Sequence, residues 1–497
     1  MPFRPVLAAA LAAILLPITA CDTTAGDHGA ILRVDIIGSA TDVAGPPRRA
    51  LAALTEAGLV GFDTSGRVVP SLASSWRIAD DGLSVIFRLA PRRWPDGKPV
   101  TATDVVASFR RATLPASRNP LRALLTPVSV DAPVDNVVEG RLSGAMPGIL
   151  ALLAQPELAV TRGGPRSQPL GPFRVTDASK QPIVLTRNPS ARPSPSITLG
   201  TVALTPVADP GAAVARFAHG RTDLVIGDGL AGFDDARLLT GTNALRVEPA
   251  WGVYGYLANT RSGPLADVRV RRALAMAIDR DGIGARLFGV ALTPVVGLVP
   301  PLPSAPAPAL PDWAIAAPAA RLDLARQLLA AAGFGPATPL TVTISLPDAR
   351  EHGAVAAEVA ASWARIGVQV QTITRSPEAH ALVVARGAFE LALVERTSPV
   401  DTPLAFVLPF TCASTSSSGG YCNAAADVFV AGARAAPDAA AGGARLGLAE
   451  AAMVADTPLI ALFAPIRWAL VSPRITGWSG NAAGQHPLAL LGITRRP

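Results

Sequence analysis

Strand-like and helix-like segments alternate through the second half of the chain, and this order restricts the folds that are open to it. Residues 340–345 and 368–372 alternate apolar and polar side chains, and residues 389–394 form a further apolar run. Residues 321–332 and 354–366 instead repeat apolar side chains with the period of an amphipathic helix. Strands that alternate with helices of this length need crossover connections, so the pattern predicts an α/β lobe.

The N-terminus has the form of an export signal that ends at a cysteine. Arg4 precedes an apolar run over residues 6–20, which has the length of a signal-peptide core but is too short to span a bilayer. The tetrapeptide 18–21 (ITAC) resembles a bacterial lipobox, which implies that Cys21 is lipidated and becomes the new N-terminus. The alternative is an ordinary secretory signal with a coincidental cysteine. We expect residues 1–20 to be removed and the mature protein to be tethered outside the cytoplasm.

Length and composition limit the class of protein. The chain has 497 residues, of which 49% are hydrophobic and 16% charged, so a large core divided into two or three lobes is expected. The net charge of +7 comes from scattered arginines rather than from a basic cluster with aromatic residues between them. We therefore expect no nucleic-acid binding.

Two cysteines remain once Cys21 is assigned to lipid. Cys412 and Cys422 flank a short stretch rich in serine and glycine. Outside the cytoplasm, a pair this close is most simply a disulfide. Two free thiols, or half of a metal site, are the alternatives, although no histidine lies nearby in the sequence.

Several short motifs are spread along the chain in an order that one known family shares. They include residues 69–76 (VPSLASSW), 94–104 (WPDGKPVTATD), 171–175 (GPFRV), 259–280 (NTRSGPLADVRVRRALAMAIDR), 421–427 (YCNAAAD) and 456–462 (DTPLIAL). Together they resemble the extracytoplasmic solute-binding proteins of ABC importers, family 5, whose members include oligopeptide-, dipeptide- and nickel-binding proteins. The resemblance covers nearly the whole mature chain.

This resemblance implies a periplasmic-binding-protein-like α/β fold of type II, with two hinged lobes and an extra subdomain on the first lobe. The first lobe would comprise residues 21–60, 166–260 and 466–497, the extra subdomain residues 61–165, and the second lobe residues 261–465. A ligand would bind in the cleft between the lobes, and hinge closure would bury it. No chemical step would follow, so the protein would not be an enzyme.

Candidate ligand contacts lie where the family's chain crosses between the lobes. Trp251, Tyr254 and Tyr256 precede Asn259, and rings with a polar tip suit a cleft that is apolar yet offers hydrogen bonds. The alternative is a strand with one core face, which would account for Tyr256 in particular. We expect one or more of these side chains to contact the ligand.

The stretch after the strand at 389–394 departs from the family. Peptide binders of this family often carry an aspartate here that pairs with the ligand's α-amino group, but Ser398 and Pro399 occupy its place. Asp401 is a substitute only if the loop shifts. Arg396 stands at the family's tryptophan position and, if it faces the cleft, would prefer a carboxylate or phosphate. The alternative is that it points to solvent.

Two enzyme-like or metal-like signals receive simpler interpretations. Residues 227–232 (GDGLAG) fit G-x-G-x-x-G, with Glu248 in the window for a ribose-binding acid. Dinucleotides are uncommon outside the cytoplasm and glycines are frequent at strand-to-helix turns, so we expect no cofactor. The histidines have no metal-like spacing, and no metal is expected, although a nickel or haem ligand among them is an alternative. They are His28, His219, His352, His380 and His486.

Taken together, the sequence predicts a lipid-anchored substrate-binding protein of an ABC transporter in the periplasm or cell envelope. It would capture a peptide or peptide-like small solute as a monomer. Its partners would be the permease and ATPase subunits, and the membrane through the lipid on Cys21. The alternatives are an extracytoplasmic enzyme on the same scaffold, or a lipoprotein outside transport that senses a ligand or acts as a chaperone.

Overall fold

The computed structural model describes residues 31–42, 45–162, 169–191, 196–239, 243–414, 419–481 and 483–494. The export signal, Cys21 and His28 lie outside these residues, and so does the predicted lipidation. No helix in the described part of the chain combines the length and apolar character that a membrane crossing requires.

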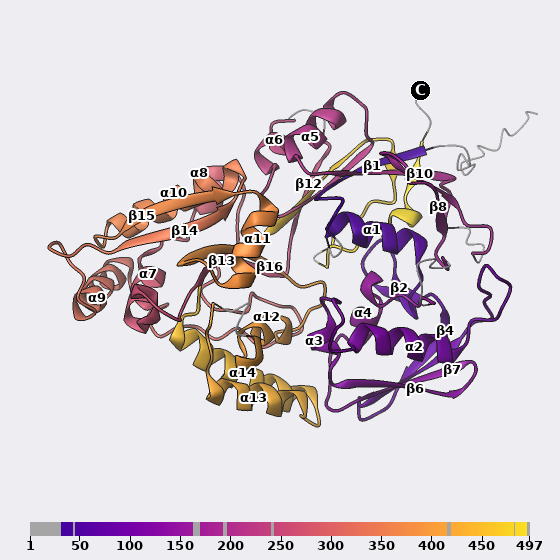
Figure 1. Ribbon diagram of the computed structural model, residues 1–497, viewed down its shortest axis with the longest axis horizontal. Helices are drawn as coiled ribbons and strands as arrows, with labels where there is room; N and C mark the ends of the chain where they lie inside the picture. The colour runs from indigo at the N-terminus through magenta and orange to yellow at the C-terminus, as the bar shows by residue number, and fades with distance from the viewer. Residues whose placement is uncertain are drawn as a thin grey trace, which may run out of the picture.

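The first lobe is built on a seven-stranded mixed sheet in the order β12-β18-β11-β1-β10-β9-β8 (Figure 1). Its strands are β1 (Ile31–Ile37), β8 (Phe173–Asp177), β9 (Ile183–Arg187), β10 (Thr201–Val207), β11 (Leu224–Asp228), β12 (Leu245–Pro249) and β18 (Ile466–Val471). Along β1, Val34 and Ile36 pack with Leu54 of α1 (Pro46–Thr55). The intervening Asp35 pairs at 2.6 Å with Arg216 of α5 (Pro210–Ala218). Because side chains alternate along a strand, α1 and α5 cover opposite faces of this sheet.

The subdomain is a four-stranded antiparallel sheet in the order β4-β5-β7-β6, with α2 packed on it. Its elements are β4 (Ala73–Ile78), β5 (Ser84–Leu89), α2 (Ala102–Thr113), β6 (Val128–Val134), β7 (Val137–Leu142) and α4 (Ile149–Leu153). The motif at residues 94–104 has a structural role, because the Asp104 carboxylate accepts hydrogen bonds from Trp94 Nε1 and from the Thr101 backbone, both at 3.0 Å. These bonds hold the turn against the start of α2 as part of a capping box.

The second lobe contains the predicted alternation of strands and helices. Its five-stranded sheet has the order β15-β14-β16-β13-β17, formed by β13 (Gly252–Ala258), β14 (Thr341–Pro347), β15 (Gln369–Arg375), β16 (Leu391–Thr397) and β17 (Leu459–Phe463). Around it lie α7 (Val268–Ala277), α9 (Pro318–Ala331), α10 (Arg350–Ala364) and α11 (Pro377–Arg386). Val355, Val359 and Trp363 of α10 are fully buried in its core. The lobe is completed by α13 (Ala424–Arg434) and α14 (Ala439–Asp456) (Figure 1).

A proline-rich segment, residues 292–311, contains no helix or strand, as its seven prolines predict. Side chains of the second lobe hold it in place. The Glu450 carboxylate on α14 accepts hydrogen bonds from the backbones of Val299 and Ala309, at 3.2 and 3.1 Å. Burial raises the pKa of Glu450 to about 7, although these backbone bonds oppose the shift.

The chain crosses between the two large sheets at two neighbouring points. The first crossing joins β12 to β13 and the second joins β17 to β18, and the Ala250 N–H donates to the Pro465 carbonyl between them at 3.0 Å. Because β13 pairs with β16 and β17, β13 belongs to the sheet of the second lobe. The sequence analysis had instead placed residues up to 260 in the first lobe. The return crossing lies between Phe463, the last residue of β17, and Ile466, the first residue of β18.

The predicted disulfide between Cys412 and Cys422 is present. It ties the segment after the short helices at 404–410 to the residue before the Asn423 cap of α13. Replacing both cysteines with serine is expected to lower the free energy of unfolding by about 2–3 kcal/mol, the loop-entropy value for so short a loop. Urea unfolding of the double variant measures this, with reduced wild-type protein as the control. An unchanged midpoint in both samples would contradict the prediction.

Candidate functional site

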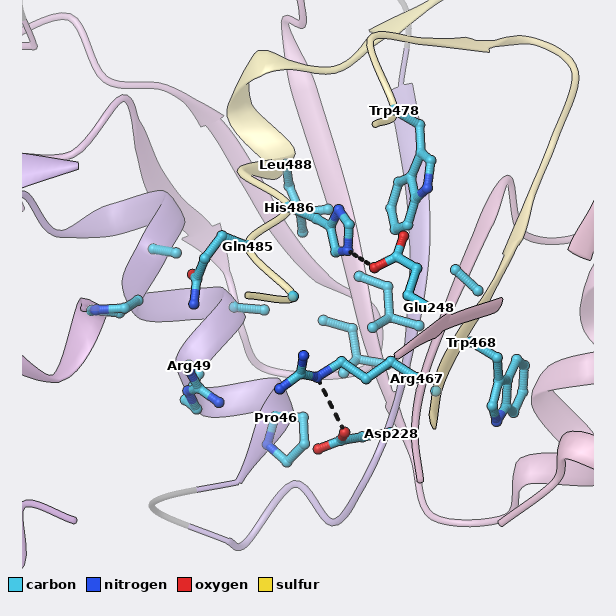
Figure 2. Close-up of a pocket in the computed structure, with 18 residues that line it drawn as sticks. Pro46, Arg49, Asp228, Glu248, Arg467, Trp468, Trp478, Gln485, His486 and Leu488 are labelled. Atoms are coloured by element: carbon cyan, nitrogen blue, oxygen red, sulfur yellow. Dashed lines mark hydrogen bonds and ion pairs between the residues drawn. The ribbon is translucent and has the colours of Figure 1, made fainter. Parts of the chain in front are cut away.

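A cavity of about 140 Å³ lies on the first lobe at the edge from which the chain crosses to the second (Figure 2). Three charged side chains from neighbouring strands form one wall. Arg467 on β18 is the direct cross-strand partner of both Asp228 on β11 and Glu248 on β12. Directly paired residues project from the same face of a sheet. The strand register therefore creates a row with the order acid, base, acid.

The polar contacts of these side chains differ in length. Arg467 Nε lies 3.7 Å from Asp228 Oδ1, which is too long for a hydrogen bond. Glu248 is engaged more closely, because its Oε2 lies 2.9 Å from His486 Nε2. The ring of His486 in turn stacks on Trp478, with ring centroids 4.1 Å apart (Figure 2). Burial lowers the pKa of Arg467, and Asp228 opposes that shift.

Helix α1 forms the other side of the cavity. Arg49 and Pro46 lie on the side toward which the Arg467 guanidinium extends (Figure 2). Arg49 Nε is 2.7 Å from Glu157 Oε1 of the subdomain. The cavity thus combines two guanidinium groups and two carboxylates within a small volume. These four groups offer contacts to a charged or zwitterionic group, and the rest of the lining is largely apolar.

Glu395 brings a third carboxylate to this region from the second lobe. It lies on β16, and its oxygens press against Gly229, where an added Cβ would stand 2.4 Å from both. The Leu230 N–H donates to the carboxylate, while Oε1 is buried and has no hydrogen-bond partner among the described residues. Burial raises the pKa of Glu395 to about 8, Asp228 adds to the shift, and Arg467 opposes it. The two lobes therefore touch at an incompletely satisfied carboxylate.

The glycines of the G-x-G-x-x-G segment are used for close packing. A Cβ on Gly227 would lie 2.3 Å from the ring of Trp468. Gly229 (φ +76°) faces Glu395, and Gly232 (φ +74°) is covered by Pro210 at 2.3 Å. The helix that follows has only the five residues Phe233–Arg237. Each glycine is required by a protein neighbour, which is the turn interpretation that the sequence favoured.

Tyr254 and Tyr256 lie in the core of the second lobe. The Tyr254 ring stacks on Phe463 with centroids 4.5 Å apart, and its hydroxyl is 3.2 Å from Nδ1 of His352. Tyr256 packs beside Trp363, and both tyrosines are 0% exposed. All seven residues of β13 are buried. In this conformation neither ring offers a surface to the cavity.

Trp251 and Asn259 lie at opposite ends of β13. Trp251 is half-buried in the crossing segment, and its carbonyl accepts a 2.8 Å hydrogen bond from the Ser398 backbone. The Asn259 amide donates to the carbonyls of Gly387 and Phe389, at 3.0 and 2.9 Å. Asn259 therefore fastens the end of the strand, while Trp251 remains beside the lobe boundary.

Arg396 and Asp401 lie apart from the charged cavity. The Arg396 guanidinium stands 4.9 Å above the ring of Phe410, and burial lowers its pKa to about 10. Arg396 is half-buried, so its side chain lies against the protein rather than extending freely into solvent. Asp401 lines a second cavity of about 110 Å³ between the subdomain and the second lobe, where its Oδ2 accepts a 2.9 Å bond from the Ser304 backbone. Ser398 is buried in a turn, hydrogen-bonded to both backbone groups of Val400.

Arg49, Arg467 and Glu395 carry the site, and the sequence did not single them out. Asp228 and Glu248 appeared only with the glycine motif, and His486 only in the histidine count. One signal was available, because charged residues at the ends of buried strands collect at one edge of a sheet. No group of three or more His, Cys, Asp or Glu side chains suited to a metal occurs in the part of the chain that the structure describes.

Comparison with known proteins places these features in a family context. The family model of bacterial extracellular solute-binding proteins, family 5 (middle), matches residues 67–418. The periplasmic oligopeptide-binding protein OppA of Salmonella typhimurium is 25% identical over 463 residues, which cover 87% of this chain and 84% of that protein. The crystal structure of Haemophilus influenzae OppA in complex with RPPGFSPFR is 23% identical, with a TM-score of 0.82 over 93% of this chain and 99% of that one.

Two structures of the murein tripeptide-binding protein MppA also match. The Escherichia coli MppA structure is 22% identical, with a TM-score of 0.83 over 94% of this chain and 99% of that one. The TM-score falls to 0.69 for MppA in its unliganded open form, at the same identity and coverage of 94% and 98%. These similarities confirm the predicted α/β fold with its lobes and subdomain.

Proposed function

Since the chain belongs to the bacterial extracellular solute-binding proteins of family 5, we propose that it is the binding component of an ABC importer for peptides or peptide-like solutes. Members of this family bind solutes and do not transform them, so the chain is a binding protein and not an enzyme. Its captured solute would be held between the two lobes and passed to a permease and its ATPase subunits.

The closed arrangement of the lobes carries this proposal. Glu395 of the second lobe lies against Gly229 of the first. On the subdomain side, the Ala145 N–H donates to the Ala436 carbonyl at 3.0 Å, and Gln155 Nε2 donates to the Pro399 carbonyl at 3.3 Å. Hinge closure around a solute buries it. A permease that recognises the closed form therefore accepts only a solute that binds this form more tightly than the open form.

The nature of the solute is inferred from relatives. Two of the similar proteins of known structure are the oligopeptide-binding protein OppA, in complex with the peptide RPPGFSPFR, and the murein tripeptide-binding protein MppA. A charged cavity beside the crossing segments supports a solute with ionised ends, as a peptide has. Trp251, half-buried at the same boundary, supports contact with an apolar part of it.

The anchor and the cellular location complete the proposal. An apolar segment followed by Cys21 supports export and lipid attachment, so the protein would act in the periplasm or cell envelope, tethered to a membrane by its first mature residue. A tethered monomer would stay near its permease without needing a membrane-spanning helix.

A thermal-shift screen tests the binding function. Purified protein is heated with pools of tri- to pentapeptides and, separately, with amino acids and other small solutes. A peptide pool at about 100 times its Kd should stabilise the folded state by about 2.7 kcal/mol and raise Tm by several degrees. The variant Arg246→Gln, changed at a β12 side chain that donates to the local carbonyls of Asn243 and Leu245, should show the same shift. If the protein unfolds cooperatively and no peptide pool raises its Tm, peptide binding is refuted.

A further inference from the structure

The subdomain and the second lobe meet where the residues after β7 face the end of α13 (Figure 1). We call this meeting point the rim contact, and it consists of residues 143–145 and 434–436. The Ala145 N–H donates to the Ala436 carbonyl at 3.0 Å, and the Ser143 hydroxyl donates to the Arg434 carbonyl at 3.3 Å. Backbone carbonyls of the second lobe therefore accept both of these hydrogen bonds.

Gly144 lies in the middle of the rim contact and has no room for a side chain. A Cβ at this position would stand 2.5 Å from the carbonyl oxygen of Arg434 and 2.9 Å from both N and O of Ala436. These are backbone atoms, so no change of rotamer relieves the overlap. Gly144 is not one of the glycines with a positive φ, so its own backbone would accept alanine without strain. The requirement for glycine therefore comes from the second lobe.

Packing beside the rim contact is incomplete. The cavity of about 110 Å³ that Asp401 lines lies between the same two parts, and Ala145 and Arg434 also line it. Well-packed protein interiors leave few voids of this size. The rim contact therefore relies on backbone fit and on hydrogen bonds, each of which favours the joined form by a factor of roughly two to ten. A contact of this strength can form and separate reversibly.

We infer that the rim contact is a latch that closes when a solute is bound, and that the absence of a side chain at Gly144 sets how tightly the latch holds. This inference rests on the proposed function, because closure around a solute is part of it. When the lobes are apart, Gly144 faces no atom of the second lobe and a side chain there meets nothing from that lobe. A substitution at Gly144 therefore raises the free energy of the closed form alone. The apparent affinity for the solute falls with the population of that form.

The first test measures the binding of an equimolar tripeptide pool by calorimetry. Gly144→Ala should bind the pool at least about fivefold more weakly than wild type, since overpacking against fixed atoms typically has this effect or a larger one. Ser143→Ala removes one hydrogen bond without any overlap and should weaken binding about threefold. Gly447→Ala on α14, where a Cβ would meet nothing within 4 Å, should bind like wild type. Without solute, the urea midpoints of Gly144→Ala and wild type should agree, because opening relieves the overlap.

Hydrogen exchange at the Ala145 amide gives a direct measurement of the latch. This N–H is bonded to Ala436 across the boundary, so saturating wild-type protein with the pool should slow its exchange at least about tenfold. The slowing should be much smaller in Gly144→Ala at the same fraction of bound protein. The Ala250 amide, which donates to Pro465 between the two crossings, is the control and should exchange equally with and without solute. Mass spectrometry of fragments that contain each amide measures both rates.

The outcomes separate this inference from the proposed function. If wild-type protein binds the pool but exchange at Ala145 does not change, the latch is overturned and the proposed function stands. The latch is also overturned if Gly144→Ala binds like wild type, or if its urea midpoint falls in proportion to its affinity, because the glycine would then be an ordinary packing residue. Failure of folded wild-type protein to bind the pool would instead overturn the proposed function, and this inference with it.

Discussion

Replacing Tyr256 with alanine is expected to lower the free energy of unfolding by about 3–5 kcal/mol, the usual cost of removing a buried aromatic ring. The ring is 0% exposed and packs beside Trp363 in the core of the second lobe. Tyr256→Phe is the matched control and should be neutral or slightly stabilising, because the Tyr256 hydroxyl is buried without a partner in the described part of the chain. Urea unfolding of both variants measures the difference.

The same pair of variants decides between two roles for this tyrosine. A core residue affects stability and leaves the peptide affinity of the folded fraction largely intact. A ligand contact would do the reverse. Tyr256→Ala protein that unfolds at the wild-type urea concentration but no longer binds peptide would restore the ligand-contact hypothesis that the sequence suggested.

Stability without ligand is expected to fall between about pH 4.5 and pH 8, and Glu395→Gln should remove most of that fall. The pKa of Glu395 is about 8 in the folded protein and near 4.5 when the chain is unfolded. Below pH 4.5 both states hold the proton, so Glu395 costs nothing. As the pH rises toward 8 the unfolded state ionises first, and the folded state loses a few kcal/mol at about 1.4 kcal/mol per pKa unit.

Other titrating groups define the rest of the profile. Glu450, with a pKa of about 7, adds to the loss between pH 4.5 and pH 7. His352 acts in the opposite sense, because burial lowers its pKa to about 4 and the unfolded chain gains a proton below pH 6.5. Urea unfolding at several pH values should show Glu395→Gln equal to wild type near pH 4.5 and more stable at pH 8. Parallel curves for the two proteins would contradict the assignment.

Much of the fold could be predicted from local patterns. The hairpin of β4 and β5 and the alternation around α10 follow from hydrophobic periodicity, which records burial directly. The hairpin of β6 and β7 escaped prediction because Pro133 interrupts it and its register shifts between Asp131 and Val134. Helices α13 and α14 also escaped prediction, and in α14 the alanine-rich faces differ little in hydrophobicity.

The site was harder to predict than the fold. Asp228 and Arg467 are more than 200 positions apart in the sequence, and only the register of β11 against β18 makes them neighbours. No local pattern records such a register. The sequence pattern around Tyr254 and Tyr256 was difficult to interpret for a related reason. Both faces of β13 are covered, so an imperfect alternation of aromatic residues reflected complete burial rather than a strand with one face on a cleft.

The two crossing segments have a mechanical consequence. They run side by side, joined by the hydrogen bond from Ala250 to Pro465. Two adjacent connecting segments allow the lobes to bend about the line that joins the segments. They resist twisting and sliding of one lobe against the other. Relative movement of the halves is thereby reduced to one rotation. The transporter would therefore encounter a narrow and reproducible range of lobe orientations.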